Sequence, residues 1–163
     1  MRVRSTIHPG YRQKFLPRTS PIHSAEREPR PAGGIWPDLG GIHVFLVEDD
    51  DDTRIMVGET LQHCGAVVTT YPSADAAIAS ELVPTLFVCD LSMPGLGGLQ
   101  FMRQIRALPP ERGGQVPAIA ITAYYEDFVA AVALETGFNA YMTKPIQLEA
   151  LCRLAQELTG HPD

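Results

Sequence analysis

From residue 42 onward, short apolar segments alternate with segments of helical periodicity, and this alternation restricts the chain to few folds. Strands that alternate with helices imply a parallel sheet covered by helices on both faces. We therefore predict an α/β fold with a doubly wound, five-stranded parallel sheet. The expected strands are residues 42–47, 67–71, 85–89, 116–121 and 139–142. The expected helices are residues 52–64, 73–80, 98–108, 126–136 and 146–158.

The size and composition of the chain favour one soluble domain. Its 163 residues are 45% apolar and 20% charged, which is typical of a globular protein with one core. Its uncharged apolar stretches fall short of the roughly 20 residues that span a bilayer, and no apolar segment follows the basic N-terminus. Three widely separated cysteines favour reduced, buried thiols. We expect a cytoplasmic protein that does not associate with membranes.

Charge and proline content separate residues 1–41 from the rest of the chain. Residues 1–41 hold six prolines, five glycines and seven Lys and Arg against three acidic residues. We expect a disordered basic extension here, with a basic docking segment as the alternative. Residues 42–160 form the expected domain, and residues 42–163 carry six basic against sixteen acidic residues. So acidic a domain is not expected to bind nucleic acid directly.

Polar residues end four of the five expected strands. Glu48 and Asp49 end the first, Asp90 ends the third, Thr122 ends the fourth and Lys144 follows the fifth. If these four strands are neighbours in that order, their ends lie about 4.8 Å apart. The three carboxylates would then converge, and the long Lys side chain could reach back across about two strand spacings.

Converging carboxylates repel one another unless a cation is present. Oxygen ligands with open positions for water or phosphate suit Mg²⁺, which is the expected cofactor. The following residues, Asp50, Asp51 and Asp52, are interpreted as a solvated helix start that the helix dipole favours.

With these motifs in place, the chain resembles the receiver domains of two-component response regulators over about residues 42–160. The resemblance lies in residues 44–50, residues 88–95 with Gly97-Gly98, residues 121–123, and Lys144-Pro145. It implies the flavodoxin-like sheet order 2-1-3-4-5. Residues 106–124 look most like receivers of hybrid sensor kinases, so both a stand-alone receiver and a piece of a longer hybrid kinase are open.

The resemblance also implies a phosphoacceptor function. Asp90 would accept a phosphoryl group from a phosphohistidine on a histidine kinase or a histidine phosphotransfer protein. Asp49 would bind Mg²⁺ directly and Glu48 through water, with Asp90 and the Ser92 backbone carbonyl as further ligands. The protein would catalyse only its own phosphorylation and dephosphorylation, and is not expected to be an enzyme with a separate substrate.

A switch on a distant face would follow phosphorylation. By resemblance, Thr122 and Lys144 would contact the phosphoryl group and Tyr141 would swing inward. The output surface would be formed by the fourth helix, fifth strand and fifth helix, which would serve an unknown downstream protein or a weak dimer of an otherwise monomeric chain. The Lys144-Pro145 peptide would be cis. Ordinary core packing is the alternative for Tyr141.

Two residues are candidates for tuning the lifetime of the phosphoryl group. Ser92 and Tyr124 would flank the path of the hydrolysing water, and our hypothesis is that the bulk of Tyr124 slows hydrolysis. An exposed loop aromatic is the alternative for Tyr124. An unchanged lifetime in Tyr124→Ala would contradict the hypothesis.

Two other functions are weighed against the phosphoacceptor. A phosphatase or transferase with an aspartyl-phosphate intermediate would have a second acid two residues after the nucleophile, where Ser92 stands. The chain has no GxxxxGK[ST] or GxGxxG motif for a nucleotide. A degenerate receiver that only docks is disfavoured because all five site residues are present: Glu48, Asp49, Asp90, Thr122 and Lys144.

Overall fold

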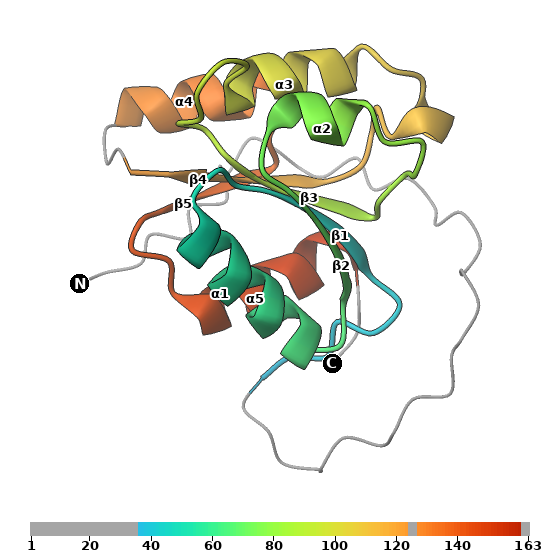
Figure 1. Cartoon of the computed structure of the whole chain (residues 1–163), viewed down its shortest axis with the longest axis vertical. Helices are drawn as coiled ribbons and strands as arrows, with labels where there is room; N and C mark the ends of the chain where they lie inside the picture. Colours follow the sequence, from blue (N-terminus) through green and yellow to red (C-terminus); the bar gives the residue numbers. More distant parts are fainter. Residues whose placement is uncertain (1–35, 124–126, 161–163) are drawn as a thin grey trace.

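The computed structural model describes residues 36–123 and 127–160, and it has the predicted α/β architecture (Figure 1). Five parallel strands are ordered β2-β1-β3-β4-β5. The strands are β1 (His43–Val47), β2 (Val67–Tyr71), β3 (Leu86–Asp90), β4 (Ala118–Thr122) and β5 (Ala140–Thr143). The helices are α1 (Asp51–His63), α2 (Ala74–Ile78), α3 (Gly98–Arg106), α4 (Asp127–Thr136) and α5 (Leu148–Leu158), with a 3₁₀ turn η1 (Pro110–Arg112).

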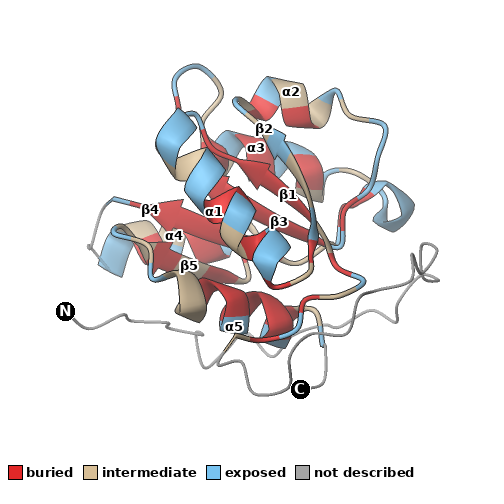
Figure 2. Ribbon diagram, turned by 60° about the horizontal axis from the view of Figure 1, so that its bottom comes forward, coloured by how far each residue is buried: buried red, intermediate tan, exposed pale blue. Residues whose placement is uncertain are grey.

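The sheet separates two apolar cores (Figures 1 and 2). Helices α1 and α5 pack on one face, and α2, α3 and α4 pack on the other. In both β3 and β4 all five residues are buried, as central strands of a doubly covered sheet require. The edge strand β2 is exposed or half-buried throughout. The fully buried part of the sheet therefore includes Asp90, the last residue of β3.

Two helix starts and one helix end follow from local residue chemistry. Asp50 caps α1, its carboxylate accepting a hydrogen bond from the Thr53 amide at 2.8 Å. Ser73 caps α2 through the Ala76 amide at 3.2 Å, as predicted. Gly65 follows α1 with a positive φ of 96°, which glycine adopts without strain. Asp50 thus has a structural role at the edge of the site.

Several elements are shorter than predicted, and tertiary hydrogen bonds explain two of the differences. The Asn139 side chain accepts a bond from the Ala118 amide at 2.9 Å, so β5 begins only at Ala140. After Arg106 the chain leaves the helix ahead of Pro109, and Arg106 itself donates to the carbonyls of Gly114 and Gly137. The predicted strand at 116–121 begins at Ala118 and includes Thr122.

The packed structure begins upstream of residue 42, where the sequence analysis placed the start of the domain. Leu39 is fully buried in the core beside α1 and α5, and its amide donates to the Cys64 carbonyl at 2.8 Å. Trp36 packs partly against the same core and lies edge-on to the His63 ring. In the described ranges, no helix combines the length and apolar character needed to cross a membrane.

Candidate functional site

Three carboxylates meet at the carboxyl edge of the sheet. Glu48 and Asp49 directly follow β1, and Asp90 is the last residue of the neighbouring strand β3. One oxygen from each carboxylate lies within 4.8 Å of the other two. Glu48 and Asp90 are buried, and Asp49 is the member that faces solvent. The strand order therefore produces the convergence that the sequence predicted.

The ammonium group of Lys144 lies among these carboxylates. Its Nζ donates to Asp90 Oδ2 at 3.2 Å and lies 3.4 Å from Glu48 Oε2. Lys144 follows β5, whose neighbour β4 lies between it and β3. Its amide donates to the Thr122 carbonyl at 2.8 Å, and the Lys144-Pro145 peptide is cis, as expected. The long side chain therefore crosses β4 to reach Asp90.

The charge balance of the site favours binding of a cation. Burial, followed by repulsion from Asp90, raises the pKa of Glu48 to about 7. Burial also opposes the charge of Lys144, but attraction to Asp90 and Glu48 outweighs burial, so the pKa of Lys144 is raised. One ammonium thus contacts two of the three carboxylates in the cluster. A further positive charge would relieve the repulsion that remains.

The loop after β3 fixes the orientation of Asp90. The Ser92 amide donates to Asp90 Oδ1 at 2.9 Å, while Oδ2 faces Lys144. The Leu91 amide donates to the Ile121 carbonyl at 2.9 Å, which extends the pairing of β3 with β4. A Cβ atom on Gly98 would lie 2.5 Å from the Asp90 carbonyl oxygen, so only glycine allows α3 to begin this close. The sequence identified the Gly97-Gly98 pair but not this contact.

Arg54 is a residue of this region that sequence reasoning missed. Its guanidinium donates to the backbone carbonyls of Glu48 at 2.9 Å and Asp49 at 3.4 Å, and it pairs with the Asp51 carboxylate. Glu48 Oε1 also accepts a bond from the Asp50 amide at 3.2 Å. These bonds hold the turn between β1 and α1. An Arg two residues after a run of five acidic residues was the available signal.

The other predicted residues take different positions. Thr122 is buried at the end of β4, beside the position where Ile121 pairs with Asp90. Tyr141 on β5 is half-buried and packs against the core beneath α4. Ser92 is exposed at the rim of the site. Tyr124 lies outside the described residues.

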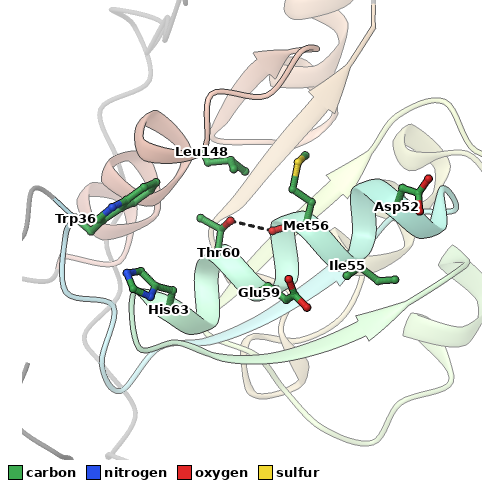
Figure 3. Close-up of a pocket in the computed structure, with 8 residues that line it drawn as sticks. All are labelled: Trp36, Asp52, Ile55, Met56, Glu59, Thr60, His63 and Leu148. Carbon is green, nitrogen blue, oxygen red and sulfur yellow. Dashed lines mark hydrogen bonds between the residues drawn. The ribbon is translucent and has the colours of Figure 1, made fainter.

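An open groove of about 450 Å³ runs along the outer side of α1 (Figure 3). Asp52 lies at the end nearest the acidic site, and Trp36 and His63 lie at the far end. Between them, Ile55 and Met56 are 55% and 43% exposed. The groove holds none of the converging carboxylates, but it begins at the helix turn that follows them.

Comparison with known protein families decides the classification. The model of the response regulator receiver domain matches residues 44–156, which is more than half of the chain. The chain belongs to this family. The receiver fold and the sheet order inferred from the sequence are therefore confirmed.

Individual relatives agree with this membership. A 14.6 kDa protein of Leptolyngbya boryana, encoded in the sodA1 3' region, is 38% identical over 121 residues, which cover 73% of this chain and 91% of that protein. The C4-dicarboxylate transport transcriptional regulatory protein DctD of Rhizobium meliloti is 32% identical over 115 residues, 69% of this chain but only 24% of that regulator. This receiver thus spans about a quarter of that longer protein.

A solved structure provides a similar comparison. The receiver domain of the sensor histidine kinase PA1611 from Pseudomonas aeruginosa PAO1 is 30% identical, with a TM-score of 0.67. The alignment covers 73% of this chain and 98% of that domain, which was solved with a magnesium ion coordinated in its active site cleft.

Proposed function

We propose that this receiver accepts a phosphoryl group on Asp90 from a phosphohistidine of a histidine kinase or histidine phosphotransfer protein. The observation that carries the proposal is the position of Asp90: buried, oriented by the Ser92 amide, and 3.2 Å from the Lys144 ammonium. A carboxylate held in this way is a nucleophile with its charge-stabilising partner already in place.

The transfer forms one bond and breaks one bond. A carboxylate oxygen of Asp90 attacks phosphorus, and the P–N bond of the phosphohistidine breaks with its electron pair returning to the imidazole. Lys144 is close enough to Oδ2 to stabilise negative charge on the transferring oxygens. The same chain catalyses only this transfer and the later hydrolysis by water.

The donor set fits Mg²⁺. Glu48, Asp49 and Asp90 supply hard oxygen ligands within one small volume, and one Lys leaves their charge only partly balanced. We infer that Asp49 and Asp90 bind the ion, with the Ser92 backbone carbonyl, and that Glu48 acts through water. When bound, the ion neutralises charge on the phosphoryl oxygens. The magnesium-bound Pseudomonas aeruginosa receiver supports this assignment.

Phosphorylation would then be read on the face formed by α4, β5 and α5. Thr122 ends β4 beside the site, and Tyr141 lies on the adjacent strand, so a hydroxyl and a half-buried ring link the site to this face. Phe128 on α4 is 74% exposed and offers an apolar contact for a downstream protein or a second copy. Thr122 would donate to the new phosphate while Tyr141 moves inward.

The donor would dock on the groove of α1. A histidine that delivers a phosphoryl group to Asp90 must approach the edge of the sheet where α1 begins. The exposed side chains of Ile55 and Met56 provide apolar contact along that approach, and Asp52 and Glu59 supply charge at its borders. A helix of the donor that presents apolar and basic residues fits this surface.

The function is tested by incubating the chain with Mg²⁺ and acetyl phosphate as a small phosphodonor. We expect one acid-stable, base-labile phosphoryl group per chain, detected by intact-mass spectrometry, and none in Asp90→Asn. Chelation of Mg²⁺ should remove the labelling. Equal labelling of Asp90→Asn would overturn the assignment, and turnover of an unrelated phosphoester would favour an enzyme instead.

A further inference from the structure

Two cysteine thiols from distant parts of the chain meet in the core between α1 and α5. The Sγ atoms of Cys64 and Cys152 lie 3.3 Å apart although 88 residues separate them in the sequence. Both cysteines are fully buried and neither forms a disulfide in the structure. Neither residue belongs to the phosphoacceptor site, which lies at the opposite end of α1.

The two sulfur atoms are already within contact distance of each other. A disulfide has its sulfurs about 2.05 Å apart, so these two sulfurs need to approach by about 1.3 Å. Cys64 lies just beyond the last residue of α1 and is followed by Gly65, whereas Cys152 lies within α5. Cys64 lies at the end of α1, where local opening costs least, so we expect it to adjust more easily than Cys152 within α5.

The third cysteine does not compete for this pairing. Cys89 lies in the other core, across the sheet, and its thiol donates to the Asp90 carbonyl at 3.3 Å. The described residues therefore contain one close thiol pair and one separate thiol.

We propose that Cys64 and Cys152 are an oxidisable pair that forms an intramolecular disulfide with a small-molecule disulfide as oxidant, joining α1 covalently to α5. The Cys64 thiolate attacks one sulfur of the oxidant, and one small thiol leaves. The Cys152 thiolate then attacks the Cys64 sulfur of the mixed disulfide and releases the second small thiol. The two protein protons pass to the two released thiolates, so the protein is oxidised by two electrons and the small disulfide is reduced.

Access to the pair requires local opening at one corner of the fold. Leu39 covers this corner and is held there by the hydrogen bond that its backbone amide donates to the Cys64 carbonyl. Opening of this segment with the last turn of α1 exposes Cys64 without unfolding the sheet. Cys64 is therefore the thiol that reacts first, and Cys152 resolves the mixed disulfide.

The test is to equilibrate the full chain in glutathione buffers of graded oxidised-to-reduced ratio, starting from both reduced and oxidised protein. Free thiols are trapped by acid quench and alkylation, and peptides are mapped by mass spectrometry without reduction. We expect a cross-linked Cys64–Cys152 peptide in the wild type and in Cys89→Ala, with the same midpoint ratio from both directions. Cys64→Ala and Cys152→Ala should yield no intramolecular disulfide.

The thermal unfolding midpoint separates a native disulfide from one formed in unfolded chains. The oxidised wild type should unfold at a higher temperature than the reduced wild type, while Cys152→Ala should show no such difference. Three reduced thiols at equilibrium, in a buffer that oxidises a reference dithiol peptide, would overturn the proposal. Glutathione left on a single cysteine, or oxidation that lowers the midpoint, would overturn it as well. Acetyl phosphate labelling of Asp90 is scored separately, so either proposal can fail alone.

Discussion

At the scale of single residues, Lys144 contacts two carboxylates that could also bind a metal cation. Its ammonium lies 3.2 Å from Asp90 Oδ2 and 3.4 Å from Glu48 Oε2, and both carboxylates also belong to the cluster that can hold a metal. The side chain therefore lowers the negative charge that would attract the ion and, on the proposed function, also supplies positive charge to the phosphoryl group. Removing it should affect the two processes in opposite directions.

We expect Lys144→Gln to bind Mg²⁺ more tightly and to accept the phosphoryl group more slowly. A charged hydrogen bond contributes about 1.5–3 kcal/mol, so the change in labelling rate should be at least tenfold. Calorimetric titration with Mg²⁺ and the rate of labelling by acetyl phosphate measure the two effects. Arg153→Gln removes an exposed cation that pairs with Glu149 on α5 and should change neither value. Weaker Mg²⁺ binding in Lys144→Gln would contradict this account.

His43 should make stability depend on pH. Burial lowers its pKa below 6.5, and its Nε2 lies 2.7 Å from Thr69 Oγ1. The folded state therefore holds fewer protons than the unfolded state, so the contribution is complete above about pH 6.5 and is lost as the pH falls through the lowered pKa. The effect is bounded by about 1.4 kcal/mol per pH unit for one proton.

Urea unfolding of the wild type and His43→Gln at pH 7.5, 6.5 and 5.5 measures this contribution. The wild type should lose more stability on acidification than the variant. Glu48 titrates in both proteins, so its effect cancels in the difference. Parallel pH profiles of the two proteins would show that His43 does not contribute.

At the scale of elements, the start of α3 is set by a backbone contact with β3. A Cβ on Gly98 would lie 2.5 Å from the Asp90 carbonyl oxygen and 2.8 Å from Leu91 Cα. Both are backbone atoms of the strand end and the turn that follows it, so neither can rotate away. The start of α3 and the proposed phosphoacceptor Asp90 are therefore linked through direct backbone contact.

We expect Gly98→Ala to destabilise the fold by about 1–3 kcal/mol and to slow labelling of Asp90. The matched control is Gly58→Ala in the interior of α1, where a new Cβ would lie 3.6 Å from Thr70 Cγ2 and fit without strain. Alanine is the better helix former, so the control should gain about 0.5–1 kcal/mol. Urea unfolding and the labelling rate are the measurements. Equal stability of the two variants would contradict the close contact.

Element order was predictable from the sequence, whereas several element ends were not. Apolar periodicity located the five strands and five helices, and Ser73 and Gly65 marked one helix start and one helix end. The ends of β5 and α3 depend instead on Asn139 and Arg106, whose partners are distant in sequence. Burial lowers the pKa of Arg106 to about 10. This shift reflects the removal from water of the guanidinium that makes these long-range hydrogen bonds. Local patterns carry no signal for such contacts.

At the scale of the whole molecule, much of the site could be predicted because parallel strands bring their ends to one edge. The positions of Glu48, Asp90 and Lys144 followed from strand order alone. The support from Arg54 did not, because it acts through backbone carbonyls that no side-chain pattern reveals. The groove of α1 was also missed, since it depends on Trp36, upstream of the expected domain.

The groove on α1 should contribute to phosphoryl transfer from a protein donor but not from a small-molecule phosphodonor. We expect Ile55→Ser with Met56→Ser to slow phosphoryl transfer from a phosphohistidine protein several-fold and to leave labelling by acetyl phosphate unchanged, because the groove lies outside the acidic cluster. Val67→Ser, which replaces another exposed apolar residue on β2, is the control and should affect neither reaction. A loss of acetyl phosphate labelling in the double variant would indicate a structural defect rather than lost docking.

The complete burial of β3 determines which parts of the protein can respond to a new phosphoryl group. Because β3 is enclosed on both faces, we expect Asp90 to shift little if its charge and size change on phosphorylation. The proposed switch residues would then take up the displacement: the long side chain of Lys144 and the half-buried ring of Tyr141. On the proposed function, the signal would leave this site because the neighbouring side chains rearrange around a stationary carboxylate.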